Sequence, residues 1–95
     1  MSFWVYILRC RDSSFYTGHT DHLEARLASH QAGLVDNYTQ RRRPVELVFC
    51  EKFATRIEAL ERERQIKGWT RAKKQALIDG DWDRLRFLAL GGQKP

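Results

Sequence analysis

The sequence predicts a small α/β domain of short strands and helices, and three observations support this class. Two runs rich in aromatic and β-branched residues, Phe3 to Arg9 and Phe15 to Thr20, have the composition of strands. The polar stretch 11–14 joins them, which predicts a β-hairpin. Helix-capping signals recur along the rest of the chain. The 95 residues fit a single domain, expected over 1–90, and the end at 91–95 is predicted to be frayed.

The first predicted strand is apolar on both of its faces. Alternation puts Val5 and Ile7 on one face and Tyr6 and Leu8 on the other. A strand with one face in water alternates between apolar and polar residues, and this strand does not. We therefore expect helices to cover both sides of the sheet.

The region after the hairpin is predicted to contain one helix, one loop and a third strand. Asp21 has the side chain of an N-cap, and Glu24 follows three residues later, as in a capping box. Gly33 is the predicted end of this helix. The stretch 34–43 has no clear period and is predicted to be a loop. Apolar residues alternate weakly over 45–53, which predicts a strand.

The last third of the chain is predicted to be helical. Thr55 and Glu58 match the capping box, and the helix that they open is expected to end near Lys67. Thr70 and Asp81 are predicted to cap two further short helices. The predicted order of elements is therefore β-β-α-β-α-α-α.

The charge of the chain indicates an anionic partner. Seventeen Lys and Arg against twelve Asp and Glu give a formal net charge of +5. Such an excess in a small domain favours nucleic acid, because neutralising phosphates releases counterions. A basic surface that serves only solubility is the alternative.

The cellular compartment is predicted from features that the sequence lacks. No apolar run approaches the roughly 18–20 residues needed to span a bilayer, and the first residues lack the pattern of a secretory signal. Cys10 and Cys50 have no paired spacing, which favours two reduced thiols over a disulfide or a metal site. We expect a cytoplasmic protein.

One carboxylate stands where the helix opened by the capping box should be apolar. Helical spacing places Glu63 with Ile66 on or beside the buried stripe of that helix. A buried charge needs a partner. Two alternatives stay open: a salt bridge to Arg62 or Arg64, or ligation of a divalent cation such as Mg²⁺ or Mn²⁺.

Four further side chains suggest a chemical site together with Glu63. Arg26 and His30 are four residues apart and project from one helix face, where a solvated polar face is the alternative. Tyr6 and Tyr16 lie on neighbouring strands, either as core residues or as proton-transfer groups. A nearby cation, such as Arg26 or a protonated His30, would favour the phenolate. An arginine, a metal-binding carboxylate and a phenol together indicate metal-assisted phosphodiester cleavage.

The same residues resemble the motifs of the GIY-YIG nuclease superfamily, in its small single-domain bacterial branch. The first motif is present as Val5-Tyr6-Ile7 and the second as Tyr16-Thr17-Gly18, with the two tyrosines ten residues apart. Arg26 lies in LEARLASHQAG and Glu63 in EALERERQIKGW, which are similar to the arginine helix and the glutamate helix of the family. The stretch RRRPVELVFCEKF is also similar, so the resemblance covers roughly residues 3 to 78.

The resemblance implies a three-stranded antiparallel sheet flanked by helices, with the active site on one face of the sheet. It implies one divalent metal ion, Mg²⁺ or Mn²⁺, held by Glu63, and it places Arg26 on the scissile phosphate. It also implies that a tyrosine acts as general base or nucleophile, without deciding which one. Gly18 would let the backbone approach the site closely. His30 corresponds to the histidine that follows the family's arginine.

The sequence departs from the family pattern at a few positions. Val5 and Thr17 replace the glycine and the central isoleucine of the motif names, as is common in this branch. His19 stands where an apolar residue is often found, which adds a titratable group. Asn37 stands where a basic residue more often precedes the Tyr-Thr pair. Phosphate contact there is either weakened or shifted to the arginine run 41–43.

The leading hypothesis is a metal-dependent endonuclease acting on DNA, with branched or flapped DNA as candidate substrates and RNA as an open alternative. The second hypothesis is a nucleic-acid-binding module of the same fold that cuts poorly or not at all. A structural interaction domain with a coincidental pattern is the third. We expect a monomer or weak homodimer without membrane contact. The residues expected to bind nucleic acid are Arg41, Arg42, Arg43, Arg64, Lys67, Lys73 and Lys74.

Overall fold

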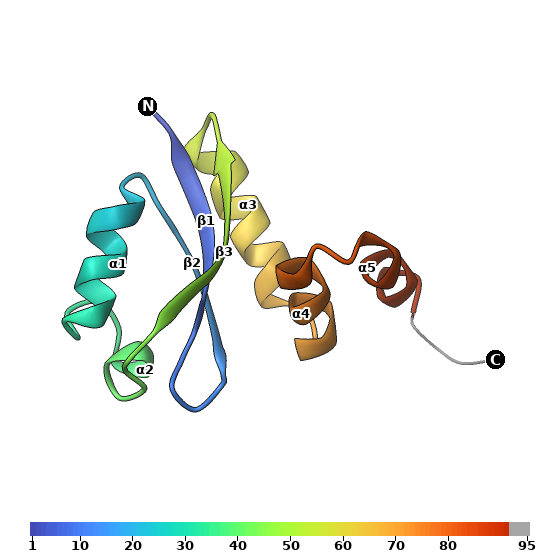
Figure 1. Ribbon diagram of the computed structural model, residues 1–95. Coiled ribbons are helices and arrows are strands. Elements are labelled where there is room, and N and C mark those ends of the chain that lie inside the picture. The colour runs from blue at the N-terminus through green and yellow to red at the C-terminus, as the bar shows by residue number, and fades with distance from the viewer. Residues whose placement is uncertain (92–95) are drawn as a thin grey trace.

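The strands form one antiparallel sheet in the computed structural model, which describes residues 1–91 (Figure 1). β1 (Phe3–Arg9) lies between β2 (Phe15–Thr20) and β3 (Glu46–Phe53). This arrangement confirms the predicted three-stranded antiparallel sheet. Residues 92–95, most of the end predicted to be frayed, lie outside the described residues.

β1 and β2 form the predicted hairpin, and their register brings the two tyrosines together. Tyr6 is opposite Gly18, and Leu8 is opposite Tyr16. Residues directly opposite each other share a face of the sheet, so both tyrosines lie on the same face. The hairpin therefore places both phenols as the sequence predicted.

The helices described within residues 1–91 confirm most of the predicted caps. They are α1 (Leu23–Gln31), α2 (Asn37–Gln40), α3 (Arg56–Lys67), α4 (Arg71–Asp79) and α5 (Trp82–Ala89). Thr55 and Glu58 form the reciprocal capping box at the start of α3. Thr70 and Asp81 cap α4 and α5 through their side chains. Such caps satisfy backbone N–H groups that have no partner inside the helix.

The predicted start of α1 is wrong by one residue. His22 is the N-cap, and its Nδ1 accepts a hydrogen bond from the backbone N–H of Ala25 at 3.3 Å. Asp21 instead faces Arg56 across 3.5 Å. The carboxylate of Asp21, which the sequence predicted as the N-cap, therefore forms an ion pair with α3 instead.

The stretch predicted to be a loop contains α2, a single helical turn. Asp36 caps it, because its Oδ1 accepts a hydrogen bond from the backbone N–H of Tyr38 at 2.6 Å. The observed order is β-β-α-α-β-α-α-α. A four-residue helix is too short to show a hydrophobic period, which is why the pattern suggested a loop.

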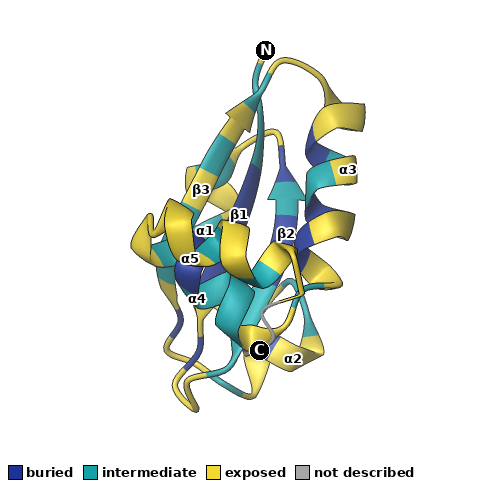
Figure 2. Ribbon diagram, turned by 90° about the vertical axis from the view of Figure 1, so that its right-hand side faces the viewer, coloured by how far each residue is buried: buried dark blue, intermediate teal, exposed yellow. Residues whose placement is uncertain are grey.

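Helices cover both faces of the sheet, as the apolar alternation of β1 predicted (Figures 1 and 2). On one face, Val5 and Ile7 form a core with Ala59 and Ile66 of α3 and with Leu77 of α4. α4 and α5 continue beyond the sheet on the side away from α1 (Figure 1).

The second core lies on the opposite face, beneath α1. Tyr6 and Leu8 belong to it, and Leu23 and Leu27 of α1 pack against it. Cys10 is also buried in this core, whereas Cys50 is exposed, and both thiols are free. Within residues 1–91, no helix has the length and apolar character to cross a membrane.

Candidate functional site

A buried chain of hydrogen bonds links β1, α1 and α2. The hydroxyl oxygen of Tyr6 lies 2.8 Å from Nε2 of His30. On the other side of the ring, Nδ1 of His30 lies 2.9 Å from Oγ1 of Thr39. The Thr39 hydroxyl in turn donates to the carbonyl oxygen of Asp36 at 3.2 Å. His30 and Thr39 are fully buried and Tyr6 is 2% exposed.

The order of these partners favours one set of proton positions, which we infer from the hydrogen-bond chain. The single proton of the Thr39 hydroxyl points to the Asp36 carbonyl, so Oγ1 must accept from Nδ1–H of His30. A neutral imidazole then presents a bare Nε2, which accepts the hydroxyl proton of Tyr6. Burial lowers the pKa of His30, and the charge of Arg26 lowers it further, so the neutral form is favoured. The solvated position considered for His30 is therefore wrong.

The lack of a side chain at Gly18 leaves room for the Tyr6 ring over β2. A Cβ atom at Gly18 would lie 2.5 Å from the Tyr6 hydroxyl oxygen, closer than two atoms can approach. Tyr16 lies alongside, with ring centroids 6.4 Å from Tyr6 and 5.1 Å from His30. The two phenols and the imidazole therefore form one aromatic cluster beneath α1. The close approach that the resemblance implied at Gly18 is made by the phenol of Tyr6.

The pKa values of both tyrosines are raised, whereas the sequence led us to expect a nearby cation to favour the phenolate. Burial raises the pKa of Tyr6 far above its ordinary value, and the neighbouring Tyr16 adds to the rise. Burial also raises the pKa of Tyr16. The charge of Arg26 acts in the lowering direction on both phenols but is outweighed. Both hydroxyls are therefore protonated at neutral pH, and protonated His30, which was considered as an activating cation, is not favoured.

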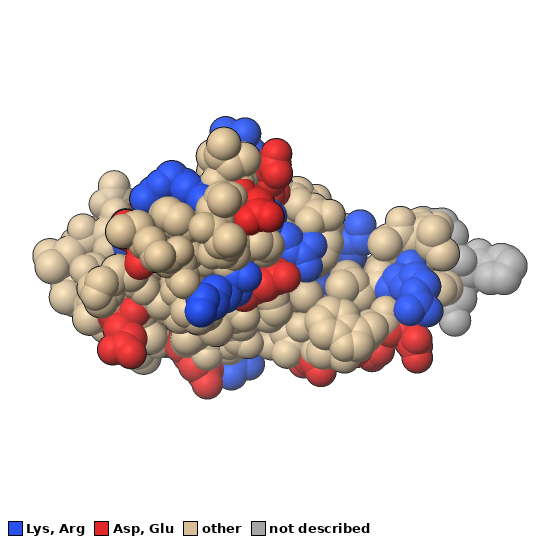
Figure 3. Space-filling view, turned by 90° about the horizontal axis from the view of Figure 1, so that it is seen from above, with Lys and Arg blue, Asp and Glu red and all other residues tan. Residues whose placement is uncertain are grey.

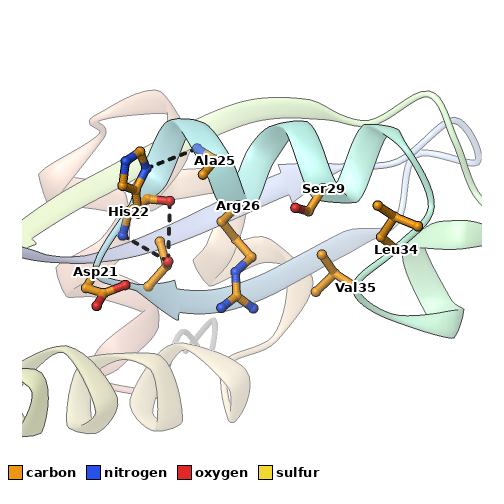
Figure 4. A pocket seen from close by; sticks show the side chains of 8 residues that line it. Asp21, His22, Ala25, Arg26, Ser29, Leu34 and Val35 are labelled. Carbon is orange, nitrogen blue, oxygen red and sulfur yellow. Dashed lines mark hydrogen bonds between the residues drawn. The ribbon is translucent and has the colours of Figure 1, made fainter.

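Arg26 reaches from α1 toward β2 in an open cavity (Figure 4). This cavity has a volume of about 460 Å³ and is also lined by Thr20 and Ser29. Among the described residues, no carboxylate forms an ion pair with the Arg26 guanidinium. A free guanidinium fork at the edge of a cavity is suited to a phosphate.

Glu63 is buried, with 8% exposure, and both of its oxygens have partners. Oε1 lies 2.5 Å from Nδ1 of His19, and Oε2 lies 2.9 Å from Nζ of Lys67. Burial raises the pKa of the Glu63 carboxyl, but the hydrogen bonds to His19 and Lys67 outweigh burial and hold it below its usual range. Neither predicted partner pairs with Glu63: Arg62 pairs with Glu51 at 3.0 Å, and Arg64 forms no ion pair with any described residue.

Glu63 and the tyrosine cluster lie on opposite faces of the sheet, next to its free edge. β2 is an edge strand, and its alternation turns Tyr16 toward α1 and His19 toward α3, where it meets Glu63. The charge of Glu63 nevertheless contributes to raising the pKa of both phenols. Tyr6, Tyr16, Arg26, His30 and Glu63 therefore form one neighbourhood that wraps around β2.

A single ionised carboxylate suits a hydrated divalent ion. Mg²⁺ is commonly bound through one or two carboxylates, with water and substrate phosphate completing its shell. Among residues 1–91, no cluster of three His, Cys, Asp or Glu side chains can form a protein cage for a metal. The donor set therefore fits an ion that the protein holds through Glu63 alone, shared with water and a phosphate.

The residues predicted to bind nucleic acid are not equally free. Arg42 pairs with Asp12 at 2.9 Å and lies 3.8 Å above the Tyr38 ring. Arg43 donates to the backbone oxygens of Gln40 and Gln31 at 3.0 and 3.3 Å. These two arginines support the fold around α2, and contact with nucleic acid stays a prediction for the whole set.

The surface charges do not gather into one basic patch on the face seen from above. Lys and Arg side chains there alternate with Asp and Glu side chains (Figure 3). Arg41 and Arg64 are exposed, whereas Lys74 is half-buried beside Tyr16. The net charge of +5 alone therefore does not locate a binding surface.

Sequence reasoning missed two functional contacts. Thr39 holds Nδ1 of His30, and His19 holds the carboxylate of Glu63. His19 and Glu63 are 44 positions apart, so no local pattern connects them. The only available signal was that His19 departs from the apolar residue often found at its position.

A three-stranded sheet with two tyrosines on one face, and with an arginine and a glutamate on flanking helices, defines a catalytic domain of the GIY-YIG type. The family model described as the GIY-YIG catalytic domain matches residues 2–76. The chain belongs to this family, as the resemblance indicated.

Relatives named UPF0213 are similar to most of the chain. One from Staphylococcus haemolyticus is 47% identical over 76 residues, which are 80% of this chain and 93% of that protein. One from Haloquadratum walsbyi is 49% identical over 80 residues, 84% of this chain and 90% of that protein.

Solved structures of similar proteins share the fold. The solution NMR structure of a UPF0213 protein from Bacillus halodurans has a TM-score of 0.56 and 35% identity, covering 93% of this chain and 97% of that chain. The solution NMR structure of protein EF2693 from E. faecalis has a TM-score of 0.59 and 38% identity, covering 84% of this chain and 85% of that chain.

Proposed function

We propose that the protein is a metal-dependent endonuclease that hydrolyses phosphodiester bonds in DNA. The carrying observation is the buried hydrogen bond from Tyr6 to the neutral imidazole of His30, close to the cation of Arg26. Hydrolysis needs a group that takes a proton from the attacking water and a cation that balances charge on the phosphate. Membership of the GIY-YIG family and the net charge of +5 support the choice of nucleic acid as substrate.

In the proposed reaction, Tyr6 relays a proton rather than ionising beforehand. The oxygen of a water molecule bonds to phosphorus while its proton passes to the hydroxyl oxygen of Tyr6, which substrate binding would have to open to that water, since Tyr6 is 2% exposed. Tyr6 gives its own proton to Nε2 of His30, which becomes an imidazolium still bonded to Thr39. The ester P–O bond breaks, and the leaving oxygen takes a proton from solvent. The raised pKa of Tyr6 is then no obstacle, because no free phenolate has to form.

Arg26 and Glu63 have separate tasks in this reaction. The Arg26 guanidinium would bind the non-bridging phosphate oxygens, whose charge grows in the transition state. The Glu63 carboxylate would hold Mg²⁺ or Mn²⁺, which supplies a Lewis acid at the phosphate. For this, one carboxylate oxygen has to exchange its present partner, His19 or Lys67.

The second candidate is a binding module that keeps the fold without cutting. It is favoured by the ion pairs of Glu63, because a carboxylate with a partner on both oxygens also suits a structural role. Location in the cytoplasm and a monomeric or weakly dimeric state belong to both candidates as proposals.

Cleavage of a substrate panel decides between the two candidates. Labelled duplex, single-stranded, flapped and branched DNA, with matching RNA, are incubated with Mg²⁺ or Mn²⁺ and with EDTA. We expect cleavage of DNA that needs the metal and is lost in Tyr6→Phe. Binding without cleavage by the parent under all conditions would instead establish the binding module.

A further inference from the structure

A second cavity lies at the free edge of β2, beside the candidate active site. Its volume is about 270 Å³, near the lower end for small-molecule sites, so it suits one base or nucleoside rather than a larger ligand. It shares Tyr16 and Lys67 with the candidate active site. Its other walls are two aromatic rings, a second lysine, one carboxylate and one buried threonine, and the proposed reaction uses none of these.

The threonine in this cavity is Thr17, and its hydroxyl has no partner. Thr17 is 3% exposed, and within the described part of the chain no group forms a hydrogen bond with its Oγ1. Buried polar atoms in native proteins nearly always have a partner, since an unmet hydroxyl lowers stability. A valine has the same shape without this cost. We take the unmet hydroxyl as a group for a ligand in this cavity, which would reach Oγ1 after a small shift of the cavity wall, because the atom is closed to water in the unbound protein.

Phe15 and Tyr38 give the cavity two aromatic walls, and arginines outside the cavity lie against both rings. The Arg42 guanidinium is 3.8 Å from the Tyr38 ring centroid, and that of Arg71 is 4.3 Å from the Phe15 ring centroid. Each ring therefore has a guanidinium against one of its faces, and Tyr38 also stacks on Tyr16 with ring centroids 6.3 Å apart. Aromatic walls suit a flat ligand with a π-face, such as a nucleobase.

The two lysines of the cavity differ in their partners, because Lys67 pairs with Glu63 at 2.9 Å and Lys74 has no such anion among the described residues. Burial lowers the pKa of Lys74, and the charges of Arg71 and Lys67 lower it further. Asp36 is the carboxylate in the lining, and it is committed to capping α2. A phosphate beside the lysines would relieve the repulsion among these cations.

We propose that this cavity is a subsite for one unpaired nucleotide of the substrate strand. The base lies between Phe15 and Tyr38 with an edge bonded to Thr17, and its phosphate lies at Lys67 and Lys74. A base in an intact duplex is stacked and paired, so it enters such a cavity only at the cost of unstacking and unpairing, which an unpaired base does not incur. The inference rests on the proposed function and narrows it, because the substrate is then single-stranded or flapped nucleic acid.

Binding in EDTA tests the subsite without requiring cleavage. Fluorescence anisotropy compares a labelled single strand with the blunt duplex of the same sequence. We expect the parent to prefer the single strand, and we expect Tyr38→Ala to weaken that binding about tenfold, taking base–aromatic stacking as the guide. Tyr38→Phe, the matched control, keeps the ring and should bind as the parent does. Lys74→Gln should weaken single-strand binding and lower its salt dependence.

Thr17→Val supplies the decisive comparison. It should raise the midpoint of thermal unfolding, because it removes an unmet hydroxyl, and it should still weaken single-strand binding while leaving duplex binding unchanged. The subsite is overturned if single-strand affinity is unchanged in both Thr17→Val and Lys74→Gln. It is also overturned if a mononucleotide binds as tightly as the oligonucleotide. If the protein shows the predicted single-strand binding but cuts no substrate, the subsite is supported and the nuclease activity is rejected. If both variants cut single-stranded and flapped DNA at the parental rate, the nuclease is kept and the subsite is rejected.

Discussion

The hydroxyl of Tyr6 donates a hydrogen bond to Nε2 of His30 across 2.8 Å, at a place almost closed to water. This contact distinguishes two phenols that the sequence left equivalent. Tyr6 has a proton acceptor in line, whereas Tyr16 only packs its ring against the imidazole, with centroids 5.1 Å apart. Within residues 1–91, no side chain forms a hydrogen bond with the Tyr16 hydroxyl. Under the proposed function, this asymmetry favours Tyr6 over Tyr16 as the proton relay.

We expect Tyr6→Phe to be the more damaging of the two tyrosine variants. Removing the hydroxyl of Tyr6 should lower the single-turnover cleavage rate about 10²-fold or more, the usual share of a proton-transfer group. Tyr16→Phe should lose much less, and both variants keep their rings and their packing. Equal rates for the parent and both variants between pH 6 and 9 would show that the phenols only fill the core.

The shape of the pH profile separates a relay from a preformed phenolate. A relay needs neutral His30, whose pKa is lowered, so the rate should already be level at neutral pH. A free phenolate would instead make the rate climb up to pH 9, because burial raises the pKa of Tyr6. The single-turnover rate of the parent, measured across this range with metal held in excess, checks the prediction.

Thr39 should act on catalysis only through His30. Thr39→Val removes the acceptor at Nδ1, so the ring proton is free to move to Nε2, where it blocks the proton of Tyr6. We expect a rate loss of about 10²-fold in Thr39→Val and recovery in Thr39→Ser. The ¹⁵N NMR shifts of the His30 ring report the tautomer directly, without any cleavage. A parent that already carries its proton on Nε2 contradicts the relay.

Local chemistry explains how much of the fold could be predicted. The Thr55–Glu58 capping box, the hairpin and the apolar alternation of β1 depend on residues close in sequence, and all three are confirmed. The cap at Asp21 failed because a distant arginine, Arg56, attracts that carboxylate. Helical spacing also predicted that Glu63 is buried, since it requires only the period of α3.

The candidate site could be predicted only as a set of residue types. The sequence and the family resemblance indicated Tyr6 and His30, but not that one donates to the other or that the imidazole is neutral. Those facts depend on burial and on Thr39, which lies in a helical turn too short to leave a period. The direction of the tyrosine pKa shift failed for the same reason, because desolvation depends on packing.

Arg26 should contribute more to the transition state than to binding. Arg26→Lys keeps the positive charge but loses the planar fork that bonds two phosphate oxygens. We expect a rate loss of roughly 10²-fold or more, while the affinity for DNA in EDTA changes little. A lysine variant with near-parental turnover contradicts this role. Arg84→Lys, an exposed change on α5, which lies beyond the sheet on the side away from α1, is the matched control.

His30 should make the fold less stable in mild acid. Its folded pKa is lowered from 6.5, so the unfolded chain binds the proton more readily. The stability that the buried ring contributes is full above about 6.5 and is lost as pH falls from there through the folded pKa. Urea unfolding should therefore give a lower free energy at pH 5.5 than at pH 7.5. His30→Gln should reduce that difference, and an equal difference in both proteins contradicts the prediction.

Glu63 should be the protein's contribution to metal binding. Its folded pKa is lowered, so the carboxylate is ionised at neutral pH and available to a cation. Calorimetric titration with Mn²⁺ should show binding to the parent and none to Glu63→Gln, which keeps the shape and loses the charge. Glu61→Gln, an exposed change on the same helix, controls for the loss of one negative charge. The midpoint of thermal unfolding should stay close to that of the parent in both variants. At position 63, the Gln side chain can still form a hydrogen bond with His19 or Lys67, and position 61 is exposed.

His19 decides how the carboxylate receives the metal. Its Nδ1 occupies one oxygen of Glu63 at 2.5 Å, so an incoming cation competes with it or with Lys67. We therefore expect His19→Ala to bind Mn²⁺ at least as tightly as the parent, and to need less metal for half-maximal cleavage. Weaker Mn²⁺ binding by His19→Ala would instead make the imidazole a second ligand of the ion. Unchanged Mn²⁺ binding in Glu63→Gln would remove Glu63 from the metal site and leave its ion pairs as a structural feature of α3.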